Sequence, residues 1–243
     1  MATPRFFVDL PLAVGATVRL PEAVAHHARR VLRLRGGDAI VLFDGRGGEY
    51  RAVLGDGADP ALAHVEAFDP VERESPLAMT LVQALVAADR LDWIVEKAVE
   101  LGAARILIAA TERSVARLDA PRAERRLRHW RALAVAACAQ CGRNRLPDVA
   151  YFASLPAALD AVADTPSRLL LMPTAPQPLP AARPAGAVAL VVGPEGGFSV
   201  TETQYAERVG VIATRLGPRI LRTETAGLAA LAALQALAGD LAD

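Results

Sequence analysis

The sequence is nearly without lysine, has two cysteines and contains no long apolar run. Its apolar runs are far too short to cross a bilayer, which excludes a membrane-spanning helix. The opening stretch, MATPRFFVDLPLAVG, lacks a basic segment followed by a long apolar one, so we expect no signal peptide and a cytoplasmic protein. Hydrophobic residues make up 53% of the 243 residues, which is ample for a packed core and excludes global disorder.

The two cysteines, Cys138 and Cys141, have the C-x-x-C spacing of redox and zinc motifs. No second cysteine pair and no nearby histidine completes a zinc site, so we expect no metal. The spacing also places both thiols on one face of a helix, within an alanine-rich stretch. We therefore interpret them as small, reduced core residues.

Lys97 is the only lysine, so almost every cation is an arginine. The formal net charge is zero, which argues against a polycation that coats nucleic acid. The arginines are nevertheless clustered, and arginine favours bidentate contacts with phosphate. From the sequence alone, RNA contact and solvated helix faces are both open for these clusters, which lie at residues 29–35, 113–131 and 143–145.

Residues 5–68 are typical of a small β-rich domain. Short apolar or alternating segments separated by glycine turns predict a small barrel or sandwich. A helix is expected over residues 21–34, with Val24, His27, Ala28 and Val31 on one face. A charged segment between prolines, residues 69–76, predicts a domain boundary.

After residue 76 the pattern changes to strands that alternate with helices. Strands are expected near residues 78–86, 104–110, 167–172, 186–192 and 210–216, with helices near 89–102, 121–141, 201–210 and 223–243. This alternation predicts an α/β domain with a mostly parallel sheet. Ligands of such sheets bind beyond the carboxyl ends of the strands, where three loops rich in glycine, proline or threonine follow at residues 172–174, 193–199 and 216–226.

The loop GPEGG, residues 193–197, fits neither common nucleotide motif. Phe198 stands where a phosphate loop would have lysine, and the glycines do not follow G-x-G-x-x-G. Ser199 and Glu202 form an S-x-x-E capping box that would open the next helix. The loop alone is also compatible with a plain strand-to-helix connection, in which the helix N-terminus stabilises Glu195.

The third loop, RLGPRILRTETAGL, is rich in polar groups within an otherwise apolar region. Arg219 and Arg222 bring two cations to it, and Glu224 adds a carboxylate to the start of the last helix. Thr223 or Thr225 could cap that helix. Packing alone does not explain this concentration of polar side chains.

Together, GPEGGFS and LGPRILRTETA, separated by one helix and one strand, resemble the signature of the bacterial 16S ribosomal RNA uracil-N3 methyltransferases, of the SPOUT class. Five other segments also agree with that family, so the resemblance covers nearly the whole chain. They are HHARRVLRLRGGD, FDGRGGEY, EKAVELG, ERS and AQCGR. It implies an RNA-binding PUA-like β-barrel over residues 1–72 and a trefoil-knotted α/β methyltransferase domain over 73–243. The implied cofactor is S-adenosyl-L-methionine, the implied assembly is a homodimer, and neither a metal nor a membrane is involved.

The implied reaction is methylation of N3 of a uridine in 16S ribosomal RNA, free or within an assembled small subunit. Arg222 is the first candidate catalytic residue, and Glu195 or Glu224 could accept the N3 proton or orient Arg222. The alternatives are a related enzyme acting on a ribose 2′-hydroxyl or another base atom, and a non-catalytic RNA-binding protein. The expected cofactor contacts are Leu171, Met172, Pro173, Gly193, Pro194, Glu195, Gly196, Leu216, Gly217, Ile220, Leu221, Arg222, Thr225 and Ala226, and the expected RNA contacts are Arg5, Arg29, Arg30, Arg33, Arg35, Arg113, Arg125 and Arg143.

Overall fold

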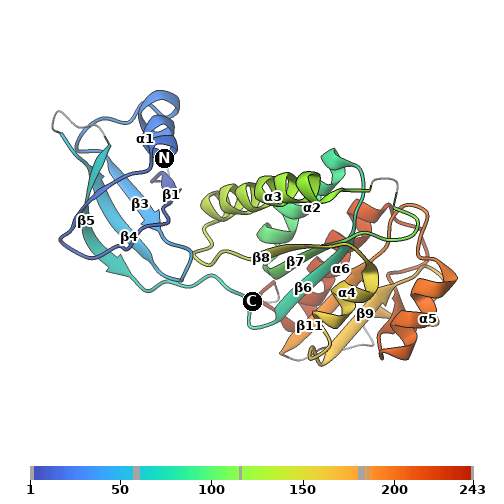
Figure 1. Cartoon of the computed structure of the whole chain (residues 1–243). Helices are drawn as coiled ribbons and strands as arrows, with labels where there is room; N and C mark the ends of the chain where they lie inside the picture. The colour runs from blue at the N-terminus through green and yellow to red at the C-terminus, as the bar shows by residue number, and fades with distance from the viewer. Residues whose placement is uncertain (1–2, 57–60, 115–116, 180–183, 185, 242–243) are drawn as a thin grey trace. The chain divides into compact units, whose positions relative to one another are not determined.

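The computed structural model describes residues 3–56, 61–114, 117–179, 184 and 186–241. These residues form two compact units (Figure 1). Unit 1 comprises the chain up to residue 74 together with residues 138–146, and unit 2 comprises residues 75–137 and 147 onward. The chain therefore enters unit 1 a second time, through a segment that the sequence assigned to the 73–243 domain.

Unit 1 is built on a five-stranded sheet in the order β1-β3-β4-β5-β2. Strand β1 pairs parallel to β3, and the other neighbours are antiparallel. The sheet curls into a half-barrel, in agreement with the expected small β-barrel domain, and β1 and β2 lie at opposite ends of its strand order within the described residues. Its buried face includes Ile40, Leu42, Ala52 and Val65. The strands are β1 (Arg5–Phe7), β2 (Thr17–Arg19), β3 (Ala39–Phe43), β4 (Glu49–Leu54) and β5 (Leu62–Asp69).

The helix expected over residues 21–34 is shorter and changes its winding. Helix α1 (Glu22–His26) continues as a π-helical turn η1 (His27–Val31). The wider π turn shifts the side chains that follow it, so the expected common face is wrong. Ala28 is fully buried, whereas His27 is exposed and Val31 is 59% exposed.

Unit 2 confirms the expected α/β fold with a parallel sheet. Seven strands lie in the order β10-β12-β9-β11-β6-β7-β8, and every neighbouring pair is parallel. All carboxyl ends therefore lie at one edge of the sheet. The sequence interpretation missed β8 and β10. The strands are β6 (Ala78–Ala84), β7 (Ala103–Ala109), β8 (Asp148–Phe152), β9 (Ser167–Leu171), β10 (Gln177–Pro178), β11 (Ala187–Val192) and β12 (Ile212–Arg215).

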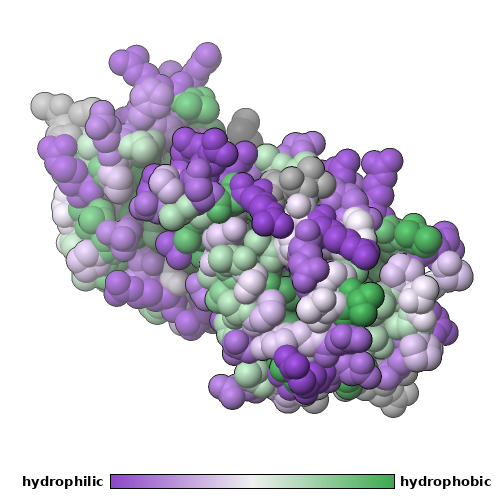
Figure 2. All heavy atoms as spheres, turned by 45° about the vertical axis from the view of Figure 1, so that its right-hand side comes forward, coloured by the Kyte–Doolittle hydropathy of each residue, from purple (hydrophilic) through white to green (hydrophobic). Residues whose placement is uncertain are grey.

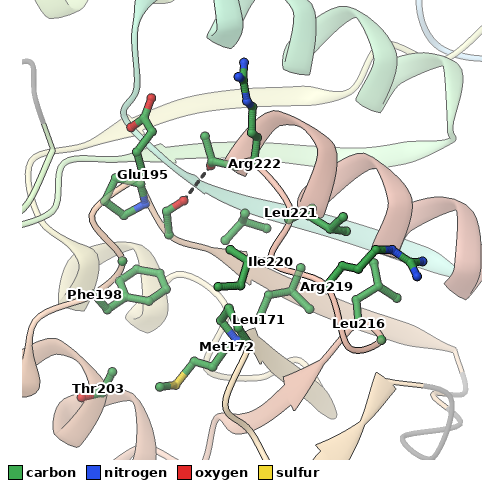
Figure 3. Close-up of a pocket in the computed structure, with 18 residues that line it drawn as sticks. Leu171, Met172, Glu195, Phe198, Thr203, Leu216, Arg219, Ile220, Leu221 and Arg222 are labelled. Carbon is green, nitrogen blue, oxygen red and sulfur yellow. Dashed lines mark hydrogen bonds between the residues drawn. The ribbon is translucent and has the colours of Figure 1, made fainter.

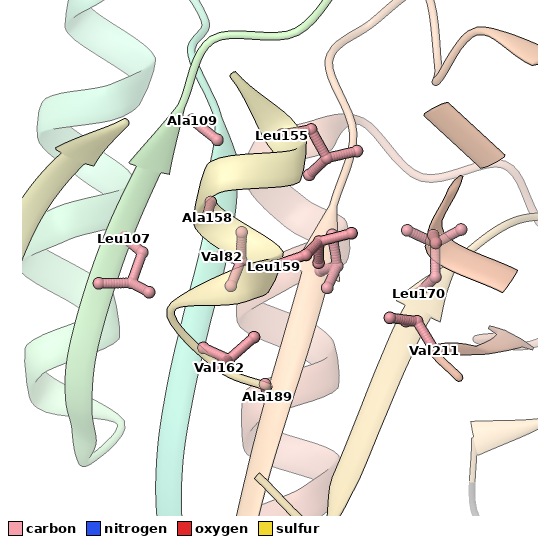
Figure 4. Packing of buried hydrophobic residues seen from close by; sticks show 12 residues of the cluster. Val82, Leu107, Ala109, Leu155, Ala158, Leu159, Val162, Leu170, Ala189 and Val211 are labelled. Carbon is pink, nitrogen blue, oxygen red and sulfur yellow. The ribbon is translucent and has the colours of Figure 1, made fainter. Parts of the chain in front are cut away.

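Helices cover both faces of this sheet. Helices α2 (Ala88–Glu100) and α6 (Thr223–Ala238) pack together on one face, and α4 (Leu155–Asp160) and α5 (Val200–Arg208) pack on the other. Strands β6, β7 and β11 are buried on both sides, which explains their continuous apolar runs. Between the sheet and α4, a core cluster includes Val82, Leu107, Leu159 and Ala189 (Figure 4). Helix α3 (Ala120–Cys141) is the arginine-rich helix expected after residue 120.

Hydrophilic side chains cover most of the molecular face drawn in Figure 2, with small hydrophobic patches between them. No helix among the described residues is long and apolar enough to cross a membrane. No group of three or more histidine, cysteine or acidic side chains in this part of the chain could hold a metal ion. Strand order does not specify how a loop is threaded, so the trefoil knot stays a prediction.

Candidate functional site

The three loops named from the sequence meet in one cavity of about 440 Å³. They leave the carboxyl ends of β9, β11 and β12, which the parallel sheet brings to the same edge. Figure 3 shows side chains from all three loops around the cavity. The lining residues are Leu171, Met172, Pro173, Val192, Gly193, Pro194, Glu195, Gly197, Phe198, Thr203, Leu216, Gly217, Arg219, Ile220, Leu221, Arg222, Thr223 and Ala226.

Most of this lining is apolar or backbone. A Cβ atom at Gly193 would lie 3.0 Å from the Phe198 ring, so the backbone passes close to that ring because residue 193 has no side chain. Gly197 and Gly217 have φ of 69° and 71°, the left-handed region that glycine adopts without strain. Lys97 lies on α2, where its Nζ pairs with Glu96 and Glu100, and no lysine lines the cavity.

Three charged side chains line the cavity, Glu195, Arg219 and Arg222, and the first and last of them stand together at its rim. In Figure 3, Glu195 and Arg222 extend from the same side of the cavity, away from the apolar side chains of Leu171 and Ile220. The Glu195 carboxylate is paired with Arg90, and both side chains are about one-third exposed. The sequence interpretation missed Arg90, although a cation one residue after Asp89, at the start of α2, was a visible signal.

Two buried hydrogen bonds that share the Thr223 hydroxyl join the loop after β12 to the loop after β11. Gln83 Nε2, at the end of β6, donates to Thr223 Oγ1 at 3.0 Å, and Thr223 Oγ1 donates to the Gly193 carbonyl at 2.7 Å. Gln83 is fully buried and Thr223 is 6% exposed. The expected capping role of Thr223 or Thr225 is wrong, because Arg222 occupies the N-cap position and no side chain caps α6. The Thr223 hydroxyl fixes the 193–197 loop instead.

The capping box at the start of α5 is confirmed. Ser199 Oγ accepts from the Glu202 backbone N–H at 3.1 Å, and Glu202 Oε2 accepts from the Ser199 N–H at 2.9 Å. Glu202 is only 5% exposed, and its Oε1 accepts from the Glu112 backbone N–H at 2.9 Å. Arg113 Nη1 donates to the Gly196 carbonyl at 2.9 Å. Two contacts therefore connect the loop after β7 to the loop after β11.

All but two of the expected cofactor contacts line the cavity. Gly196 faces Arg113 outside the lining, and Thr225 is exposed on α6. Glu224, an expected catalytic residue, also lies outside the lining, and its buried Oε2 has no hydrogen-bond partner among the described residues. Six lining residues were not among the expected cofactor contacts, although four of them lie in loops named from the sequence: Gly197, Phe198, Arg219 and Thr223, with Val192 and Thr203 outside those loops.

Two of the arginines expected to contact RNA, Arg5 and Arg143, make ion pairs and hydrogen bonds within unit 1. Arg143 is 4% exposed, and its Nη2 and Nε bond to the Glu74 carboxylate at 2.5 and 3.0 Å. Arg5 pairs with Glu49 and donates to Asn144 Oδ1 at 2.6 Å. A phosphate would have to displace these contacts, so the structure gives both guanidinium groups a packing role in place of the expected RNA contact.

The other expected RNA contacts are more accessible. Arg30, Arg33, Arg35 and Arg125 are exposed, and Arg29 is half-buried with its Nη2 donating to the Gly55 carbonyl at 3.0 Å. Arg113 is exposed, but one of its guanidinium nitrogens is already used at Gly196. The exposed arginines of unit 1 stay predictions as phosphate contacts.

The cysteines are free thiols. Cys138 is fully buried, and burial raises its pKa from 9.0 to about 12. A thiol with this pKa is unreactive near neutral pH. This agrees with the expected role of Cys138 as a small core residue.

Comparisons with known proteins identify the family. Residues 73–235 match the family model of the RNA methyltransferase domain, and residues 20–66 match that of the RNA methyltransferase PUA domain. The ribosomal RNA small subunit methyltransferase E of Mycobacterium tuberculosis is 36% identical, covering 98% of this chain and 93% of its own. The Bacillus subtilis protein of the same name is 30% identical, covering 95% of each chain.

Solved structures agree with these matches. The ribosomal RNA small subunit methyltransferase E of Neisseria gonorrhoeae, bound to S-adenosyl methionine, has a TM-score of 0.90 at 39% identity, covering 99% of this chain and 100% of its own. The Legionella pneumophila protein Lpg2936, with bound cofactor SAM, has a TM-score of 0.91 at 32% identity and the same coverage. The chain belongs to the ribosomal RNA small subunit methyltransferase E family.

Proposed function

We propose that this protein methylates N3 of a specific uridine in 16S ribosomal RNA, with S-adenosylmethionine as the methyl donor. The observation that carries the proposal is the cavity at the ends of β9, β11 and β12, which combines an apolar floor with Glu195 and Arg222 at its rim. Relatives that match nearly the whole chain are named for small-subunit ribosomal RNA, and two structural neighbours hold the cofactor.

The cavity residues fit S-adenosylmethionine. Adenine requires an apolar slot and backbone hydrogen bonds, which Leu171, Met172, Leu216 and Ile220 and the glycine loops offer. When bound, the cofactor supplies an electrophilic methyl group from its sulfonium centre.

The residues at the rim of the cavity are left to activate the uridine. Uridine N3 carries a proton and is a poor nucleophile until that proton is lost. The charge of the resulting anion spreads over the two neighbouring carbonyl oxygens, so a guanidinium from Arg222 that meets one of them stabilises the anion. Glu195 lines the cavity while Glu224 does not, so we assign proton removal to Glu195, which Arg90 orients.

The two domains divide the task. We assign RNA binding to residues 1–72 and catalysis to residues 73–243, in agreement with the domains matched at 20–66 and 73–235. We also assign the protein to the cytoplasm, as a homodimer that modifies ribosomal RNA alone or in an assembled small subunit. Ile220 at the cavity is 84% exposed, and Leu237 on α6 is 49% exposed, which supports a partner chain covering apolar surface. Light scattering after size exclusion measures the oligomeric state.

The function is tested with small subunits from cells that lack this protein and labelled S-adenosylmethionine. Wild-type protein is expected to produce a single N3-methyluridine, identified by mass spectrometry of nucleosides. Arg222→Ala is expected to abolish most turnover while leaving cofactor affinity within a few fold. Methylation of a ribose, or normal turnover by Arg222→Ala, would contradict the assignment. Arg168→Ala, at the amino end of β9, is the matched control.

A further inference from the structure

A second cavity, of about 410 Å³, lies beside the site described above. It is formed where β7 and β8 end, so it lies at the same edge of the parallel sheet as the first cavity. Its size is near the lower end of small-molecule sites, which are about 300–1,000 Å³. The lining residues are Ala110, Thr111, Glu112, Arg117, Leu118, Tyr151, Ala153, Ser154, Leu155, Pro156, Thr201, Glu202 and Tyr205.

Helix α5 separates the two cavities. Thr203 lines the first cavity, whereas Thr201 and Tyr205 line the second. Successive residues of an α-helix turn by about 100°, so Thr203 points about 200° away from Thr201, while Tyr205 returns to the side of Thr201. The two cavities therefore lie on opposite sides of one helix, about one helix diameter apart, or roughly 10 Å.

The wall between the cavities is held by several hydrogen bonds, of which the one between Ser199 N–H and Glu202 is buried. The Glu202 carboxylate holds both the start of α5 and the Glu112 backbone, and Arg113 holds the Gly196 carbonyl. Tyr205 is also held, because its hydroxyl donates to Asp160 at 2.9 Å and Arg208 lies 4.9 Å from its ring centroid. A ligand in the second cavity would meet a pre-organised surface.

The second cavity offers the chemistry of a nucleotide site. Tyr151 is half-buried, and among the described residues its ring makes no contact with another aromatic ring. Arg117 is an exposed cation of the lining. Proteins that bind single-stranded RNA combine these two features, an aromatic ring on which a base stacks and a cation for the backbone.

We propose that this cavity binds an unstacked base of the RNA strand near the target uridine. Tyr151 stacks on the base, and Arg117 meets the adjoining phosphate. The proposal rests on the proposed function, because it assumes that the substrate is RNA and that the target base enters the first cavity. In this proposal the second cavity recognises a nucleotide that is not itself methylated.

The experiment measures binding of 16S ribosomal RNA from cells that lack the protein, by filter binding at several salt concentrations and without cofactor. Tyr151→Leu is expected to raise the Kd about tenfold without changing its salt dependence, because it removes stacking and no charge. Tyr151→Phe keeps the ring and is expected to stay within twofold of wild type. Arg117→Gln is expected to reduce the slope of log K against log salt by about 0.7, the value for one contact with a single-strand phosphate.

Arg168→Gln is the matched control, because Arg168 stands at the amino end of β9, at the opposite edge of the sheet. Melting temperature and the Kd for S-adenosylmethionine are expected to be unchanged in all four variants. The proposal is overturned if folded Tyr151→Leu binds RNA as tightly as the wild-type protein does. It is also overturned if Arg117→Gln leaves the salt slope unchanged, because the exposed Arg117 side chain can be replaced without disturbing the core. Failure of the proposed function is seen separately, as absence of methyl transfer by the wild-type protein.

Discussion

The substitution Thr223→Val tests how the fold fixes the cofactor loop. Valine has the shape of threonine but removes the hydroxyl that accepts from Gln83 at 3.0 Å and donates to Gly193 at 2.7 Å. Each intramolecular hydrogen bond contributes about 1 kcal/mol, so the two together contribute about 2 kcal/mol to the free energy of unfolding. For a chain of this size, 1 kcal/mol moves the Tm by about 2–4 °C, so a Tm lower by about 4–8 °C is expected.

The same change is expected to weaken binding of S-adenosylmethionine. Once the Gly193 carbonyl is released, the cofactor must order that residue itself, at a cost of about 1–2 kcal/mol for one backbone residue. A cost of about 1.4 kcal/mol corresponds to a tenfold higher Kd. Thermal unfolding measures the first effect, and titration calorimetry with S-adenosylmethionine measures the second.

Two control variants make this prediction refutable. Thr223→Ser keeps the hydroxyl and is expected to retain most of the stability and the cofactor affinity. Thr17→Val removes an exposed hydroxyl in unit 1 and is expected to change neither quantity. If Thr223→Val behaves as wild type, or if Thr223→Ser is as defective as Thr223→Val, the Thr223 hydroxyl does not hold the loop.

Three further predictions concern charge and burial. Burial raises the pKa of Cys138, so the contribution of its neutral thiol to stability is complete below about pH 9 and is lost as pH rises towards 12. Cys138→Ala is expected to flatten this decline of the unfolding free energy, which denaturant titrations at several pH values measure. Arg90→Gln is expected to leave the Tm within 2 °C, since a pair whose side chains are about one-third exposed contributes about 0–1 kcal/mol. It is also expected to lower kcat as much as Glu195→Gln does, and additive losses in the double variant would contradict their pairing. Glu202→Gln keeps shape but weakens acceptance from two backbone N–H groups, so the Tm is expected to fall by several degrees, whereas an unchanged Tm would show that the charge is dispensable.

The local features of the fold could be predicted from the sequence because they depend on neighbours along the chain. Continuous apolar runs marked the buried parallel strands, glycines marked turns, and the Ser199–Glu202 box marked the start of α5. The errors are also local in origin. Nothing in residues 21–34 indicated a π turn, and β8 is a short strand of only moderate burial, so its apolar signal was weak.

Contacts between residues far apart in sequence were decided only by the tertiary structure. Thr223 could not be recognised as the partner of Gly193 and Gln83, because from the sequence it was itself a candidate cap of the last helix. Arg5 and Arg143 have the same charge as the exposed arginines, but burial against Glu49 and Glu74 gives them a different role.

The sequence by itself therefore determined the parallel α/β sheet and the three loops of the first cavity, because the local order of residues carries those signals, and its paired motifs indicated the family by their resemblance to a known signature. The tertiary structure decided which polar groups meet, because a parallel sheet brings loops that are far apart in the sequence to one edge. Thus Arg90 reaches Glu195, Gln83 supports Thr223, and Arg117 and Tyr151 line a second cavity that no single stretch of sequence indicates.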